Sequence, residues 1–137
     1  MTDTTPTESN LSGLDRKDFQ KNINSRKTDL YILKNAQGME VAVTNYGCAI
    51  LSIMVPDKNG KFANVILGHD SIEHVINSPE PFLSTTIGRY GNRIANGKFT
   101  LYGEEHQLTV NNGPNSLHGG PTGFHALSLI HISEPTR

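Results

Sequence analysis

The sequence predicts an all-β protein, folded as an antiparallel β-sandwich or barrel. Short apolar runs alternate with turn-forming segments, and thirteen glycines and seven prolines punctuate the 137 residues. Only one segment has a helical pattern, and aromatic residues make up 7% of the chain. Short strands spaced by turn signals are typical of sandwiches and barrels. The length suits one domain with its own core and is too short for two.

Residues 1–28 are polar and predict a flexible N-terminal arm. Leu14 and Phe19 are the arm's candidates for docking onto the body. Residues 29–125 are expected to form the N-terminal part of the β-sandwich.

A series of short strands is expected from Asp29 onward. The segments that predict them are 30–33, 39–44, 49–55, 64–67, 98–101 and 106–110. The first two flank a turn at 35–38 and the last two a turn centred on Gly103, as in β-hairpins. The segment 49–55 is apolar almost throughout, which predicts burial on both faces of its sheet.

Two further local signals precede the polar loops. Gly47 marks a bend or a close backbone approach. One short helix is predicted over 72–76, capped by Asp70 or Ser71 and stopped by the prolines that follow.

The composition excludes several functional classes. Twelve lysines and arginines against thirteen acidic residues leave a net charge of −1, without the footprint of a nucleic-acid or anionic-membrane partner. Cys48 is the single cysteine, which excludes an intrachain disulfide. The six histidines lack the spacing of a metal motif. No apolar run approaches the ~20 residues that span a bilayer, and the start lacks a secretory signal, so we expect a cytoplasmic protein.

Two polar, glycine-rich loops carry the candidate chemistry. Residues 88–93 (GRYGNR) hold Arg89, Asn92 and Arg93, and residues 111–120 (NNGPNSLHGG) hold His118. Both flank the second predicted hairpin, which brings them to the same end of a sheet, where binding residues are common.

The residue types in these loops suit a ligand covered in hydroxyls. Arginine presents a fork of donors, and asparagine presents both a donor and an acceptor. A sugar fits this set better than a phosphate, because the glycines do not match a phosphate-binding loop. The alternative is that Arg93 pairs with an acidic residue and only stiffens its loop.

The same loops carry a family resemblance. The motifs Asn45-Tyr46-Gly47, 88–99 (GRYGNRIANGKF) and 111–124 (NNGPNSLHGGPTGF) resemble the aldose 1-epimerase (galactose mutarotase) family, and the likeness runs from Asp29 to His125. One departure is Gly91, where the family more often carries alanine.

The resemblance implies both a fold and an activity. The fold is the galactose mutarotase-like supersandwich, truncated here. The activity is interconversion of the α and β anomers of a free aldohexose, glucose or galactose, by acid/base ring opening and reclosure without a cofactor. The alternative on the same fold is a non-catalytic sugar-binding or regulatory protein.

Site residues follow from the matched motifs. The resemblance implies that Asn92, Arg93 and His118 bind the sugar and that Arg89 supports them. The family's catalytic acid, a histidine, and its base, a glutamate, are expected in downstream segments. His125 and Glu134 match neither of those motifs, so no catalytic residue is expected in this chain, which is predicted to be an inactive fragment.

Residues 126–137 are expected to be a non-native tail. Leu127–Arg137 resembles the translation of an adapter used in sequencing-library preparation. The alternative is that this segment, apolar and then polar, forms a strand.

Overall fold

The structure is a computed structural model that describes residues 10–128. Glu134 and the rest of the adapter-like tail beyond Ser128 lie outside the described residues. The elements in chain order are η1 (Arg16–Phe19), β1 (Asn22–Ile23), β2 (Arg26–Lys27), β3 (Leu30–Lys34), β4 (Glu40–Thr44), β5 (Ile50–Pro56), β6 (Phe62–Asn64), α1 (Ile72–Ile76), β7 (Arg93–Ile94), η2 (Ala95–Gly97), β8 (Lys98–Leu101), β9 (Glu104–Gln107), β10 (Ser116–Leu117) and η3 (Phe124–Ala126). The paired strands are all antiparallel, which confirms the predicted fold class.

The largest sheet has four strands in the order β3-β4-β5-β6, so each strand pairs with its neighbour in the sequence. The predicted first hairpin is confirmed, with Leu30 opposite Thr44 and Lys34 opposite Glu40. Its turn is held by the Asn35 side chain, whose Oδ1 accepts from the N–H groups of Gln37 and Met39 at 3.0 and 2.9 Å.

The predicted helix is confirmed as α1, a single short turn after the sheet. Ser71 is its N-cap, because the Ser71 side chain accepts a hydrogen bond from the His74 N–H at 3.3 Å. Ile72 and Val75 point into the core from its inner side.

Two predicted strands are displaced by two residues or more along the sequence. The fourth strand is β6 at Phe62–Asn64 instead of 64–67, because the Asn64 side chain accepts from the N–H groups of Ile53 and Ile66 in place of a regular ladder bond. One further backbone bond to β5 runs from the Val65 N–H to the Ile53 carbonyl at 3.0 Å. Val65 and Leu67, beyond β6, are 59% and 78% exposed. The last strand is β9 at Glu104–Gln107 instead of 106–110, because the turn before it is tight and pairs Leu101 with Glu104.

Only one face of the four-stranded sheet is covered by the described residues. The core gathers residues from the N-terminal segment, the sheet and α1: Phe19, Leu30, Ala42, Ala49, Leu51, Ile72 and Val75. On the other face Leu33, Val41 and Ile53 lie opposite one another across three strands, and Leu33 is 60% exposed.

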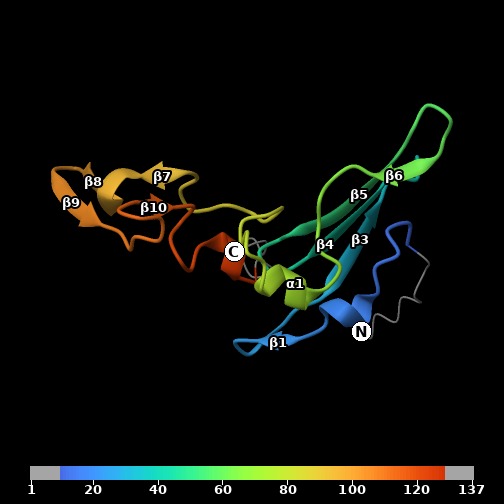
Figure 1. Cartoon of the computed structure of the whole chain (residues 1–137), viewed down its shortest axis with the longest axis horizontal. Coiled ribbons are helices and arrows are strands. Elements are labelled where there is room, and N and C mark those ends of the chain that lie inside the picture. Colours follow the sequence, from blue (N-terminus) through green and yellow to red (C-terminus); the bar gives the residue numbers. More distant parts are fainter. Residues whose placement is uncertain (1–9, 129–137) are drawn as a thin grey trace, which may run out of the picture.

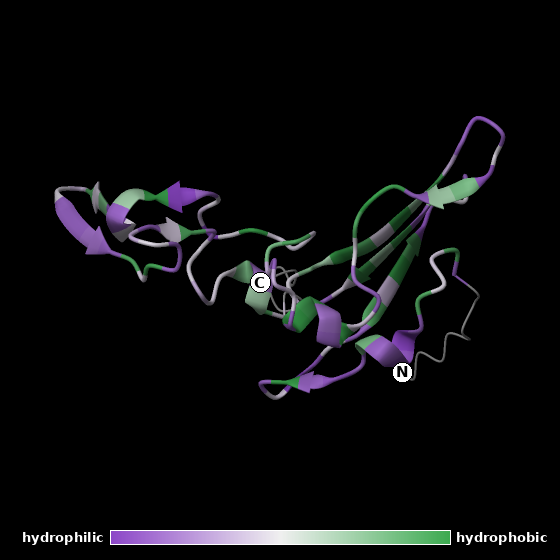
Figure 2. Ribbon diagram, viewed as in Figure 1, coloured by the Kyte–Doolittle hydropathy of each residue, from purple (hydrophilic) through white to green (hydrophobic). Residues whose placement is uncertain are grey.

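The predicted burial of 49–55 on both faces is partial: Ala49, Leu51 and Ser52 are buried, and the other four residues are half-buried. Leu51 and Ser52 are both buried because a β-bulge shifts the register opposite Ala42 and Val43. Apolar residues make up much of β3, β4 and β5 (Figure 2).

The segment before Asp29 packs onto the covered face. Phe19 is fully buried and Leu14 packs against the same core, so the predicted docking of these two residues is confirmed. The buried Glu40 carboxylate accepts from the N–H groups of Leu11 at 2.9 Å and Ser12 at 3.1 Å, with Lys34 Nζ at 3.4 Å. The proposed domain boundary at residue 29 stays a prediction.

The remaining strands form three two-stranded sheets: β1–β2 lies near the four-stranded sheet, and the other two lie at the opposite end of an elongated molecule (Figure 1). The β8–β9 hairpin is one of them. The other pairs β7 with β10, placing Leu117 opposite Arg93 and Ser116 opposite Ile94. This pairing brings the two polar loops side by side.

Replacement of Glu40 by alanine should destabilise the protein by about 1–3 kcal/mol, because the N–H groups of Leu11 and Ser12 lose their acceptor. Urea unfolding measures the change. Glu104→Ala, at an exposed position in β9, is the matched control and should stay within about 0.5 kcal/mol of the parent. Equal effects of the two substitutions would contradict this role of Glu40.

Candidate functional site

The β7–β10 pairing brings three of the predicted site residues together. The Asn92 N–H donates to His118 Nδ1 at 2.9 Å, and the His118 N–H donates in return to the Asn92 carbonyl at 3.0 Å. Arg93 Nη1 donates to Asn92 Oδ1 at 3.3 Å. Asn92, Arg93 and His118 therefore form one connected group, which we call the Asn92 cluster.

Arg93 is held by amide oxygens. Its Nε donates to Asn112 Oδ1 at 2.9 Å, and the bond to Asn92 uses a second donor. Among the described residues no carboxylate lies within ion-pair distance of Arg93, so the alternative of an acidic partner finds no support there. These two bonds use two of the roughly five N–H groups of a guanidinium. The others have no hydrogen-bond partner among residues 10–128.

The hydrogen bond to His118 defines its tautomer. A backbone N–H can only donate, so His118 Nδ1 is the acceptor and, in the neutral ring, the proton is on Nε2. Nε2 has no hydrogen-bond partner among residues 10–128, so this N–H is free to donate to a ligand oxygen.

Both cluster residues that exchange these bonds have left-handed backbones. The φ angle is 65° at Asn92 and 53° at His118. Such conformations cost of order 1–3 kcal/mol in non-glycine residues and are commonly stored at functional sites. Asparagine and histidine are among the residues that adopt them most readily.

The two loops meet through a contact between backbones. Gly119 has a φ of +89°, and a Cβ atom on it would lie 1.9 Å from the Gly88 carbonyl oxygen. The same oxygen accepts from the Phe124 N–H at 3.1 Å. A side chain at Gly119 is thus incompatible with the observed approach of the loops.

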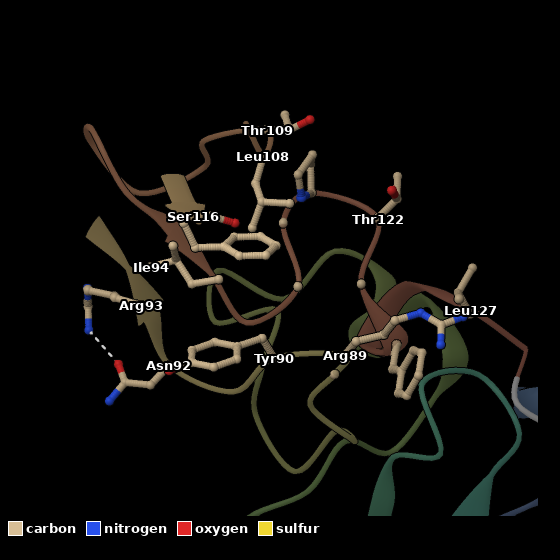
Figure 3. Close-up of a pocket in the computed structure, with 17 residues that line it drawn as sticks. Arg89, Tyr90, Asn92, Arg93, Ile94, Leu108, Thr109, Ser116, Thr122 and Leu127 are labelled. Carbon is tan, nitrogen blue, oxygen red and sulfur yellow. Dashed lines mark hydrogen bonds between the residues drawn. The ribbon is translucent and has the colours of Figure 1, made fainter. Parts of the chain in front are cut away.

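An open cavity of about 740 Å³ adjoins the cluster (Figure 3). Its walls are mainly apolar side chains, among them Tyr90, Ile94, Phe99, Leu108 and Phe124. Asn92 and Arg93 lie at one side of the drawn residues, and His118 does not line the cavity. Polar residues therefore also line the cavity: Asn92 and Arg93 at one side, and Arg89, Thr109, Ser116 and Thr122 elsewhere.

Arg89 lies apart from the Asn92 cluster. Its guanidinium carbon is 5.8 Å from the centre of the Phe124 ring, within the range of a cation–π contact. Phe124 also donates its N–H to the Gly88 carbonyl, so Arg89 contacts a residue that takes part in the approach of the two loops.

Three neighbours of the cluster were not predicted as site residues. Asn112 belongs to one of the family motifs, and its position beside a turn glycine was the available signal. Phe82 carries no sequence signal, and His125 was noted only as a mismatch to the catalytic motifs. Phe82 lies between His118 and His125, with ring centroids 4.8 and 4.7 Å away.

His125 is buried, at 8% exposure, and its Nδ1 has no hydrogen-bond partner. Burial lowers the pKa of His125 below its ordinary value of 6.5, and the nearby His118 lowers it further. The ring is therefore neutral at neutral pH.

Two kinds of feature are absent from the described part of the chain. Within residues 10–128 no three histidine, cysteine or carboxylate side chains gather as a metal site would require. No helix in that range is long and apolar enough to cross a membrane.

Comparison with known proteins places the chain in a family context. A family profile described as aldose 1-epimerase matches residues 29–131. Bovine galactose mutarotase (Bos taurus) is 44% identical over 86 residues, which is 63% of this chain and 25% of that protein. Aldose 1-epimerase of Escherichia coli K12 is 41% identical over 95 residues, 69% of this chain and 27% of that protein.

Solved structures give the same result. An aldose epimerase homologue from C. elegans superposes with a TM-score of 0.68 at 33% identity, over 74% of this chain and 31% of that one. Galactose 1-epimerase from Lactobacillus acidophilus superposes with a TM-score of 0.65 at 30% identity, over 79% and 30%. The chain thus spans about a quarter of the length of the curated relatives it matches.

Gly119→Ala should destabilise the protein by about 1–3 kcal/mol or more, because a non-glycine residue would have to adopt the left-handed backbone of Gly119. It should also disturb the Asn92–His118 bonds. Gly91→Ala is the matched control, because a Cβ atom there would lie 3.8 Å from its nearest neighbour, an Ile87 methyl carbon, and the Gly91 backbone is not left-handed. Thermal unfolding and amide NMR shifts measure both. A disturbed Gly91→Ala, or an unaffected Gly119→Ala, would refute the assignment.

Stability should fall as the pH drops below about 6.5, since the unfolded chain protonates at His125 more readily than the folded one. The loss begins as the pH passes below the unfolded value of 6.5 and levels off below the lowered folded pKa. Urea unfolding across this range measures it. His125→Gln should flatten the slope, while His69→Gln should leave the His125 contribution in place. An unchanged slope in His125→Gln would be the contrary result.

Proposed function

This chain belongs to the aldose 1-epimerase family, and we propose on that premise that its Asn92 cluster binds a free aldohexose, glucose or galactose. The reaction proposed for the whole protein is interconversion of the α and β anomers through ring opening and reclosure. The observation that carries the proposal is the β7–β10 pairing, which gathers Asn92, Arg93 and His118 from two separate loops.

The unused hydrogen-bonding groups of the cluster complement a sugar. Each sugar hydroxyl both donates and accepts, so it can receive a bond from a guanidinium N–H or from His118 Nε2–H. The Asn92 side-chain amide supplies another donor. Because the Arg93 bonds run to neutral amide oxygens, its positive charge is retained to strengthen the hydrogen bonds it donates.

Anomer exchange needs more than binding. A general base removes the proton of the anomeric hydroxyl while a general acid protonates the ring oxygen, and each must lie within hydrogen-bond reach of its target. We assign neither role to a residue of this chain. His125 in particular is buried with a lowered pKa and faces Phe82. The chain is thus proposed to supply sugar-holding residues without the proton-transfer pair.

Titration of the 137-residue chain with galactose or glucose should show saturable binding. NMR chemical-shift changes at Asn92 and His118 measure it. Arg93→Ala should weaken it by about 10- to 100-fold, the effect of losing hydrogen bonds from a charged group. Arg26→Ala, an exposed arginine in β2, is the matched control and should leave the Kd unchanged. Binding that is insensitive to Arg93, or absent, would reject the cluster as the sugar site.

Polarimetry then separates binding from catalysis. The 137-residue chain should not accelerate the mutarotation of freshly dissolved α-glucose, and clear acceleration would show that it holds an acid and a base. A longer protein that contains this sequence and binds sugar without accelerating mutarotation would instead indicate a non-catalytic sugar-binding role.

A further inference from the structure

The three rings beside the cluster form a row that ends at the proposed sugar-binding histidine. Phe82 contacts both imidazoles in T-shaped arrangements, at interplanar angles of 61° to His118 and 66° to His125. Edge-to-face contacts of this kind have a preferred geometry, so they restrict how a ring can rotate. His118 is thus constrained from a side that its hydrogen bonds do not reach.

The segment that carries Phe82 is itself fastened to the large sheet. The Ile50 N–H donates to the Ser84 carbonyl at 2.9 Å, and the Thr86 N–H donates to the Gly47 carbonyl at 2.8 Å. These bonds tie the residues around Phe82 to the start of β5 and to the bend before it. The backbone that carries Phe82 is therefore held in a fixed position relative to the sheet.

His125 closes the row from the buried end. Two glycines pack directly against His125 and leave no room for a side chain. A Cβ atom on Gly123 would lie 3.2 Å from His125 Nδ1, and one on Gly47 would lie 2.4 Å from the His125 carbonyl oxygen. With its ring buried and neutral, His125 acts as packing behind Phe82.

We propose that Phe82, backed by His125, is a positioning residue for His118. Two contacts then fix the His118 imidazole: the Asn92 N–H holds Nδ1 as an acceptor, and the Phe82 ring sets the plane of the imidazole. Together they hold His118 in the Nε2–H tautomer with one orientation. The use of that N–H toward a sugar oxygen rests on the proposed function, but the positioning itself does not.

The test uses the 137-residue chain with 15N-labelled histidine and no sugar. The parent should show an unprotonated Nδ1 and a protonated Nε2 at His118, and nuclear Overhauser contacts from the Phe82 ring to the His118 ring. Phe82→Leu should average the two nitrogen shifts of His118, while Phe82→Tyr, which keeps the ring, should restore the parent pattern. His74, an exposed histidine in α1, reports whether a variant is still folded.

Three results would overturn the proposal: no Phe82–His118 contact in the parent, an Nδ1–H tautomer there, or an unchanged His118 in folded Phe82→Leu. The first two need no variant, so a Phe82→Leu chain that fails to fold leaves the decision with the parent spectrum. Sugar titration is the separate arm. Phe82→Leu should raise the Kd by ~2–10-fold, the value of one ring contact, while a parent that binds no sugar refutes the proposed function alone.

Discussion

The site depends on one close approach between two backbones, that of Gly119 and the Gly88 carbonyl. Because a Cβ atom at Gly119 would lie 1.9 Å from that oxygen, only glycine permits the contact. The same carbonyl accepts a hydrogen bond from the Phe124 N–H, which ties the first loop to the start of η3, just beyond the second loop. The β7–β10 pairing, the paired bonds of Asn92 and His118, and the bond from Arg93 to Asn112 join the same two loops.

Polar groups in the two halves of the molecule are used differently. In the sheet, Glu40 is fully buried and its carboxylate is shared among two backbone donors and Lys34. The hydrogen-bonding capacity of this carboxylate is used inside the protein, so its role is structural. In the Asn92 cluster the internal bonds fix orientation but leave donors of Arg93 and His118 unused. Unused donors on oriented side chains are what the proposed sugar-binding role requires.

Local signals predicted the parts of the fold that depend on neighbours in the sequence. The β3–β4 hairpin and α1 follow from alternation, a turn and a capping serine, and each formed where expected. β6 was misplaced because the Asn64 side chain replaces a ladder bond, which no pattern of apolar residues records. The loops were found by composition, yet the amide partners of Arg93 and the place of Phe82 arise only from three-dimensional approach.

The order in which these parts assemble follows from the same connectivity. Each strand of the four-stranded sheet pairs with its sequence neighbour, so its contacts close short loops. The contact of Gly88 with Gly119 and Phe124 spans the whole β8–β9 hairpin, and closing a longer loop costs more chain entropy. The sheet can therefore form before the cluster does, and the cluster can open while the sheet stays intact. Under the proposed function, a sugar that binds the assembled cluster would favour its closed form.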